Sequence, residues 1–294
     1  MQYAQLRAFH AVFEHAGFSK AANALGLTQP SVSDHVRRLE QTYGVTLFHR
    51  NGRQVEPTEL GRRLSIVTQQ MLNCERDAHD LLSSAGALSW GTLSVVADAP
   101  DLVVKLLAGL RETYPGVLVK LSIANAQACV DQVLASAVDV AVTAAPQVDR
   151  RLTATTLRRE PLVALLPSGH TLAQKHRLSF AEFVAQPLIF REPRSVTQQL
   201  LSAELLRHGL SAEPAMLVEG REALEQCVAN GLGLGIIARA EFSGSRRLRC
   251  VPLVGCEGMM VESLVRLAER PPSKLLDALF LLAEKYVEAN AVTA

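Results

Sequence analysis

The chain has 294 residues, 48% of them hydrophobic, and a formal net charge of +1. This length is about twice that of a usual domain, which predicts two or three folded units with substantial cores. No apolar run approaches the roughly 18–20 residues that span a membrane, and "MQYAQLRAFH" lacks the charge pattern and apolar stretch of a signal peptide, so we expect a cytoplasmic protein with no membrane partner.

Five scattered cysteines, an odd number without a C-x-x-C pair, argue against a disulfide framework and against a zinc site. The histidines and carboxylates also lack metal-ligand spacing, so we expect no metal or other cofactor. Residues 1–65 carry a net charge of +3 and the remainder −2, which is compatible with an N-terminal unit that meets phosphates.

The first segment predicts two short helices. "AQLRAFHAVFEHAG" places apolar residues on one helical face and ends at Gly17. We expect Ser19 to cap a second helix and Gly26 to end it in a left-handed conformation.

A third helix follows at once, capped by Thr28, with Pro30 in its first turn. Its apolar positions recur at spacings of 4, 3 and 4, and the buried stripe is predicted to be Val32, Val36, Leu39 and Tyr43. The opposite face is polar. Two helices joined by a glycine turn, the second with a polar outer face, are typical of a helix-turn-helix that enters the DNA major groove.

The stretch "LFHRNGRQVEPT" predicts a β-hairpin turning at Asn51-Gly52, with Arg50 and Arg53 beside the turn. Such basic residues suit the wing of a winged helix that contacts phosphates or the minor groove. For either arginine taken alone, a solvated surface charge is an equal interpretation.

From "FSKAANALGLTQPSVSDHVRRLE" through "GRRL" the chain resembles the N-terminal domain of LysR-type transcriptional regulators almost residue for residue. The resemblance implies that Gln29, Ser31, Ser33 and position 34 face the groove. It also implies that Arg38, Arg50 and Arg53 approach the DNA backbone. Asp34 departs from the family pattern; it either accepts from a cytosine amine or pairs with Arg38 one turn on, and we favour the pair. The expected DNA-binding residues are Gln29, Pro30, Ser31, Ser33, Asp34, Arg38, Arg50 and Arg53.

Thr58 is predicted to cap a long helix that runs to about Ser84. Its apolar residues form a heptad seam that favours a coiled coil between two chains: Leu60, Leu64, Val67, Met71, Cys74, Ala78 and Leu81. An ordinary amphipathic helix usually has a wider apolar stripe. Because one recognition helix reads few base pairs, we expect a homodimer or homotetramer, as the resemblance implies, on double-stranded promoter DNA.

After the small-residue linker "SSAGALSWG", a first set of predicted strands, "TLSVVAD", "GVLVKLSIA" and "VDVAVTA", alternates with helices at about 102–114 and 126–136. A second set, "PLVALLP", "PLIF", "PAMLVE" and "LGLGIIA", alternates with helices at about 195–208 and 221–230. Apolar strands separated by crossover helices predict a parallel α/β sheet in two similar lobes. This arrangement resembles the periplasmic-binding-protein fold of LysR effector domains. The predicted fold class is therefore α/β, with an N-terminal winged helix-turn-helix (1–57), a linker helix and hinge (58–90) and a two-lobed effector domain (91–294). Lobe I is expected at about 91–160 and 267–294, and lobe II at about 161–266.

Strand ends between the lobes are the expected ligand site. Two acids in "ADAPDL", Asp98 and Asp101, are either a capping box or acceptors for an ammonium group. "FREPRSVTQQ" places donors around a helix N-terminus, which favours an anion. The expected effector-binding residues are Asp98, Ala99, Asp101, Asn125, Arg191, Arg194, Ser195, Val196, Thr197, Glu219 and Arg221.

Acids opposite an anion site predict a small zwitterion. The phrases "ADAP", "LSIAN", "REPRSVT" and "ANGLGLGI" are similar to a LysR subgroup associated with 2-aminoethylphosphonate catabolism, whose ligand has this chemistry. The resemblance assigns the amine to Asp98 and Asp101 and the phosphonate to the turn at residues 195–197; an amino acid or a dicarboxylate remains open.

Enzyme interpretations fit poorly. The glycines of "GLGLGII" follow a helix and precede a strand, the reverse of a dinucleotide fingerprint, and Ser168 and His170 lack a nucleophile elbow. The alternative is a solute-binding-like module without DNA function, which leaves the helix-turn-helix unexplained. We therefore expect a regulator whose effector changes its DNA contacts, with RNA polymerase as a partner if it activates transcription.

Overall fold

A computed structural model describes residues 1–51, 54–83, 91–145, 149–270 and 273–291. The chain divides into two compact units, Met1–Ala87 with Ala135–Ala137, and Leu88–Leu134 with Val138–Ala294. We call residues 1–57 the head and residues 91–291 the effector domain.

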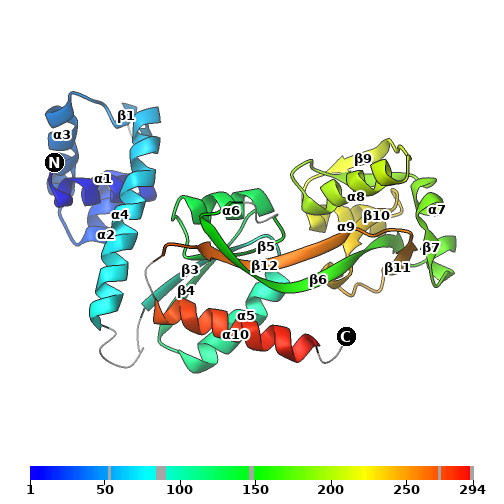
Figure 1. Cartoon of the computed structure of the whole chain (residues 1–294). Helices are drawn as coiled ribbons and strands as arrows, with labels where there is room; N and C mark the ends of the chain where they lie inside the picture. Colours follow the sequence, from blue (N-terminus) through cyan, green and yellow to red (C-terminus); the bar gives the residue numbers. More distant parts are fainter. Residues whose placement is uncertain (52–53, 84–90, 146–148, 271–272, 292–294) are drawn as a thin grey trace. The chain divides into compact units, whose positions relative to one another are not determined.

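The head contains three helices and a hairpin (Figure 1): α1 (Tyr3–His15), α2 (Phe18–Leu25), α3 (Gln29–Tyr43), β1 (Phe48–Asn51) and β2 (Gln54–Pro57). Its core is apolar and includes the fully buried Phe9, Val32 and Val36. Gly26 ends α2 at φ 65°, as predicted. A helix, α4 (Glu59–Ser83), follows the hairpin.

Three local predictions in the head are wrong. Ser19 lies inside α2, because the helix begins at Phe18 with Gly17 as its N-cap, two residues before the predicted cap. Tyr43 is 54% exposed, since it ends α3 just before Gly44 and lies beyond the core. Asn51 is the last residue of β1 and pairs with Gln54, so the hairpin forms but does not turn at Asn51-Gly52; Gly52 itself lies outside the described residues.

In the first lobe of the effector domain, three parallel strands alternate with helices: β3 (Gly91–Ala97), α5 (Pro100–Thr113), β4 (Val117–Ile123), α6 (Ala126–Leu134) and β5 (Val140–Thr143). The C-terminal helix α10 (Lys274–Ala291) packs on α5. The core between helices and sheet includes Leu102, Leu110 and Leu279, all nearly fully buried. The predicted strands and helices of this lobe are confirmed.

Two long antiparallel strands, β6 (Leu152–Pro167) and β12 (Met259–Leu267), run from one lobe into the other (Figure 1). The main sheet has the strand order β4-β3-β5-β12-β6-β11-β7, with β10 also paired to β6. The sequence pattern predicted only Pro161–Pro167 of β6 as a strand. Residues 152–160 were missed because "LTATTLRRE" is polar and its pairing partner is more than a hundred residues away.

The second lobe contains β7 (Leu178–Ser179), α7 (Phe180–Val184), β8 (Leu188–Arg191), α8 (Val196–Arg207), β9 (Pro214–Val218), α9 (Arg221–Ala229), β10 (Gly235–Ala238), the short 3₁₀ helix η2 (Arg239–Glu241) and β11 (Leu248–Val254). The predicted helices α8 and α9 and strands β8, β9 and β10 are confirmed. β7, α7 and β11 had no counterpart in the prediction. Here β10 and β11 run antiparallel to β6, so the sheet is mixed rather than parallel throughout.

Candidate DNA-binding face and effector cavity

The recognition helix α3 presents its first turn to solvent. The Thr28 hydroxyl accepts a hydrogen bond from the Ser31 amide at 3.4 Å, which caps the helix as predicted. Gln29 and Pro30 are exposed, and Ser31 and Ser33 are half-buried. Because Val32, Val36 and Leu39 are buried in the head core, the polar face of the helix is turned outward.

Asp34 is held by two arginines of the same helix. Arg38 Nε lies 2.7 Å from Asp34 Oδ2, and Arg37 Nη2 lies 3.2 Å from Asp34 Oδ1. Exposed pairs at these spacings stabilise a helix only by about 0.3–0.5 kcal/mol each. Their main consequence is electrostatic: the acid is neutralised on the face that would meet DNA, and the predicted Asp34–Arg38 pair is present.

The hairpin is fixed to the recognition helix by a carboxylate. Glu40 Oε1 accepts hydrogen bonds from the amides of Leu47 at 2.7 Å and Phe48 at 3.3 Å. Arg50 lies in β1 opposite Val55. The side chain of Arg50 and the whole of Arg53 lie outside the described residues.

At the start of α4, the Thr58 hydroxyl donates to the Thr46 carbonyl at 2.9 Å and accepts from the Gly61 amide at 3.0 Å, as a helix cap. Gly61 lies so close to the carbonyl of Leu47 that a Cβ there would be 2.4 Å from the oxygen. This close approach requires glycine, and it fixes the direction in which α4 leaves the hairpin.

One apolar stripe of α4 is open in the single chain. Leu60 and Val67 are 44% and 59% exposed, and Cys74 and Ala78 are also exposed. Leu64 and Met71 are only half-buried against the head core, and the side chain of Leu81 lies outside the described residues. An exposed stripe of heptad spacing is what a partner helix would cover.

The effector domain has a cavity of about 60 Å³ between its lobes. Lobe I and the crossing strand β12 contribute the ends of β3 and β5, the start of α6 and two residues of β12; lobe II contributes the start of α8, the end of β8 and η2. The lining residues are Asp98, Asn125, Ala126, Ala144, Arg191, Glu192, Arg194, Ser195, Val196, Thr197, Glu241, Met260 and Glu262. Seven of the eleven predicted effector residues are therefore brought together.

The N-terminus of α8 forms the lobe II end of this cavity. Ser195 is the N-cap and its hydroxyl accepts from the Gln198 amide at 3.4 Å. Ser195 and Thr197 are both buried, at 6% and 3% exposed. Arg191 is already occupied by Glu192, with Nη2 2.6 Å from Oε1, whereas Arg194 is exposed. The helix dipole, its free amides and Arg194 make this end suitable for an anion.

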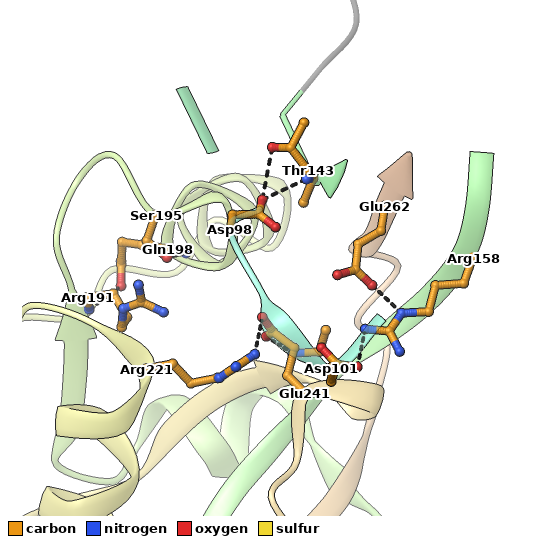
Figure 2. Close-up of polar contacts among 12 residues, drawn as sticks. Asp98, Asp101, Thr143, Arg158, Arg191, Ser195, Gln198, Arg221, Glu241 and Glu262 are labelled. Atoms are coloured by element: carbon orange, nitrogen blue, oxygen red, sulfur yellow. Dashed lines mark hydrogen bonds and ion pairs between the residues drawn. The ribbon is translucent and has the colours of Figure 1, made fainter. Parts of the chain in front are cut away.

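Asp98 forms the lobe I end. Its Oδ2 accepts hydrogen bonds from the Ala144 amide at 2.7 Å and the Thr143 hydroxyl at 3.0 Å (Figure 2). Burial raises the pKa of this carboxyl above its usual value, and repulsion from Glu241 adds to the effect. The capping-box interpretation is wrong, because α5 begins at Pro100 with Ala99 as its N-cap and no side-chain cap.

Four predicted effector residues do not line the cavity. Asp101 lies in the first turn of α5, where its carboxylate pairs with Arg158 at 2.9 Å. Ala99 is 2% exposed and only begins that helix. Arg221 pairs with Glu241 at 3.1 Å, and Glu219 borders a separate groove of about 640 Å³ between α8 and β9.

Sequence reasoning missed Glu241, Met260 and Glu262. Glu262 is 2% exposed on β12, and its Oε2 accepts a hydrogen bond from Arg158 Nε (Figure 2). Burial raises the pKa of Glu262 to about 7, although Arg158 opposes the shift. The signal was visible in "MMVESLV", where one acid interrupts an apolar strand.

In the parts of the chain that the structure describes, no group of three or more His, Cys, Asp or Glu side chains could hold a metal ion. No helix within the described ranges is both long and apolar enough to cross a membrane.

Comparison with known proteins matches residues 3–62 to the bacterial regulatory helix-turn-helix of the LysR family and residues 84–286 to the LysR substrate-binding domain. A RuBisCO operon transcriptional regulator of Allochromatium vinosum is 30% identical over 236 residues, which are 80% of this chain and 78% of that protein. The helix-turn-helix match to residues 3–62 excludes the alternative of a binding module without DNA function.

Two solved structures share the fold. A full-length OxyR variant from Pseudomonas aeruginosa superposes with a TM-score of 0.76 at 19% identity, covering 97% of this chain and 94% of that one. Full-length CbnR complexed with its target DNA has a TM-score of 0.72 at 20% identity, covering 97% and 100%. The chain belongs to the LysR family of DNA-binding transcriptional regulators and is, as predicted, not an enzyme.

Proposed function

We propose that this regulator reads its operator with the first turn of α3. Gln29, Ser31 and Ser33 would contact base edges, and Arg38 with Arg50 and Arg53 would contact phosphates. Support comes from the capped, outward-facing turn and from the buried stripe behind it. Amide and hydroxyl side chains on such a turn can read the donor and acceptor pattern of the major groove.

Asp34 acts, in this proposal, by holding Arg37 and Arg38 rather than by contacting a base. Both guanidinium groups lie within 3.2 Å of its carboxylate. An acid that met phosphates without such partners would be repelled by them.

LysR regulators act as oligomers, and we assign the contact between two chains to the apolar stripe of α4. The exposure of Leu60, Val67 and Cys74 supports this assignment. Two heads related by a two-fold axis would read a two-fold-related DNA site.

The effector proposed here is a small zwitterion bound between the lobes. Its anionic group would meet the N-terminus of α8 at Ser195 and Thr197, and its amine would meet Asp98. 2-Aminoethylphosphonate carries both groups two carbons apart and is our first candidate, on the chemistry of the cavity and the sequence phrases around it. The A. vinosum relative is a RuBisCO operon transcriptional regulator, so a carboxylated or phosphorylated metabolite is the competing ligand class.

The observation that carries the regulator mechanism is the outward-facing first turn of α3. It is tested by selecting genomic fragments that bind the full-length protein and measuring their affinity for variants. Gln29→Ala should weaken binding to the selected site by about 1–3 kcal/mol, because a base contact is lost. Gln41→Ala is the matched control, since Gln41 is also an exposed glutamine and lies near the other end of α3. Equal losses for the two variants would contradict the proposed reading face.

A further inference from the structure

Glu262 occupies an unusual position, on a strand shared by both lobes. It lies on β12 directly opposite Arg158 of β6, and the register of these two strands shifts between Glu262 and Ser263. Glu262 also lines the effector cavity, to which Arg158 does not contribute. A group bound in the cavity can therefore reach the irregular point of the long strand pair through this one side chain.

Only one of the two carboxylate oxygens of Glu262 is used. Oε2 accepts from Arg158, whereas Oε1 points away from Arg158 (Figure 2) and accepts no hydrogen bond from any residue that the structure describes. The side chain is only 3% exposed, and Glu262 lines the cavity. A carboxylate oxygen that has no protein donor can accept a charge-assisted hydrogen bond from a bound cation, which makes Oε1 an acceptor for a ligand.

The charges around this point do not balance. Arg158 is shared between Glu262 and Asp101, so the three groups together carry −1 when both acids are ionised. Asp98 accepts hydrogen bonds from a hydroxyl and a backbone amide, which are both neutral, and adds a further −1. Glu192 and Glu241 differ, because each has its own arginine partner, Arg191 and Arg221 respectively.

We infer that Asp98 and Glu262 form a cation-accepting subsite that binds the ammonium group of the effector. The inference deepens the proposed function and rests on it, with Glu262 in place of Asp101 as the second acid. A buried ammonium between two carboxylates gains charge-assisted hydrogen bonds and relieves their mutual repulsion. Glu262 then determines specificity, because an effector without the positive charge would leave both acids uncompensated.

In the absence of a ligand, a proton on Glu262 partly neutralises the negative charge of the subsite. Burial raises the pKa of Glu262 to about 7, and repulsion from Asp98 and Asp101 adds to the effect, while Arg158 opposes it. The other charged residues that line the cavity, apart from Asp98, are Glu241 of η2 and Arg191, Glu192 and Arg194, which precede α8. An ammonium group needs the ionised acid, so its binding expels the proton. Effector affinity therefore falls as the pH drops below 7, by up to about tenfold per pH unit.

The test is calorimetric titration of the full-length protein with 2-aminoethylphosphonate and with ethylphosphonate, in two buffers of different ionisation enthalpy. For the wild type, we expect release of about half a proton at pH 7 with the amine and none attributable to Glu262 with ethylphosphonate. Glu262→Gln should abolish that release and weaken the amine at least tenfold, with ethylphosphonate unchanged or improved. Asp101→Asn, outside the cavity, tests the acid that the sequence had suggested: it should keep the preference for the amine, with less proton release because one source of repulsion on Glu262 is removed.

Glu262→Asp keeps the charge and should retain the amine preference, which separates loss of charge from loss of folding. Equal weakening of both ligands by Glu262→Gln, or the same proton release in wild type and variant, would overturn the inference. Binding of ethylphosphonate but not of the amine by a protein that still binds its operator would also overturn it, and would leave the regulator proposal intact. If the wild-type protein bound no operator DNA, that result would instead count against the proposed function.

Discussion

The hairpin of the DNA-binding unit and the acidic end of the effector cavity differ in the sequence distance that their polar contacts cross. Around the hairpin, Glu40 accepts a hydrogen bond from an amide seven residues away, and Thr58 at the start of α4 donates to a carbonyl twelve residues away. In the cavity, Asp98 accepts from Thr143, 45 residues away, and Arg158 donates to Glu262, 104 residues away. Local contacts re-form whenever the chain segment folds, whereas distant contacts require that whole lobes be in place.

The difference has a functional consequence. A reading surface should keep one shape, and the head is built from a continuous segment with fixed caps and turns. A sensing site must have two states that the ligand binds unequally. The cavity meets this need, because its walls come from two lobes joined by the long strands β6 and β12.

The largest expected effect tests how strictly the head depends on local geometry. Gly61→Ala would place a Cβ 2.4 Å from the carbonyl oxygen of Leu47, and backbone must move to relieve the clash. We expect a loss of about 3 kcal/mol in the free energy of unfolding of the head, with loss of operator binding. Urea unfolding of the full-length protein measures it.

Gly17→Ala is the matched control in the same unit. A Cβ at Gly17 would have its nearest neighbour at 3.9 Å, and its φ of 173° is open to any residue. Equal stability of the two variants would show that the contact between Gly61 and Leu47 does not fix the start of α4.

A second, intermediate effect is a pH dependence of stability that has opposite signs in the two units. His10 of the head is buried, with Nδ1 2.8 Å from the Thr68 hydroxyl, and burial lowers its pKa below 6.5. Below pH 6.5 the unfolded chain binds a proton that the folded head excludes, so the head loses stability as the pH falls.

Glu262 makes stability depend on pH in the opposite direction. Its pKa is raised from 4.5 to about 7, so between these values the folded state binds a proton that the unfolded state does not. The effector domain should therefore gain stability as the pH falls from 7 towards 5. Thermal unfolding at pH 7.5, 6.5 and 5.5 should show the two opposite trends, removed separately by His10→Gln and Glu262→Gln. A common trend for both units would contradict the assignment of these groups.

The smallest expected effect concerns the charge balance of the recognition helix. Asp34→Asn releases Arg37 and Arg38 from the carboxylate and costs only about 0.5 kcal/mol of stability. The freed arginines should raise affinity for unrelated DNA several-fold at low salt and steepen its salt dependence. Fluorescence anisotropy over a salt series measures both. An unchanged salt slope would mean that the ion pairs do not restrain the arginines.

The same contrast explains what sequence could predict. The cap at Thr28, the left-handed Gly26 and the pair between Asp34 and Arg38 each depend on residues within one or two turns. Residue spacing therefore contained the evidence. The misplaced cap at Ser19 shows the limit of such reasoning, because α2 has Gly17 as its N-cap, a residue without a side chain that could cap the helix.

In the effector cavity, the spacing of residues in the sequence led to a wrong prediction. Asp98 and Asp101 are three residues apart, which predicted that they act together, yet the chain turns between them and Asp101 meets Arg158 instead. Glu262 joins Asp98 only through the order of β3, β5 and β12 in the sheet. Its burial and its partner depend on the pairing of β6 with β12, which no local pattern contains.

The most direct test of the zwitterion cavity is titration calorimetry of the full-length protein with three compounds that differ by one charged group. 2-Aminoethylphosphonate has both charges, ethylphosphonate lacks the amine and ethanolamine lacks the phosphonate. We expect the zwitterion to bind at least tenfold more tightly than either control, because each end of the cavity needs its own charge. Equal or tighter binding of ethylphosphonate would contradict it, and would assign the cavity to a purely anionic effector.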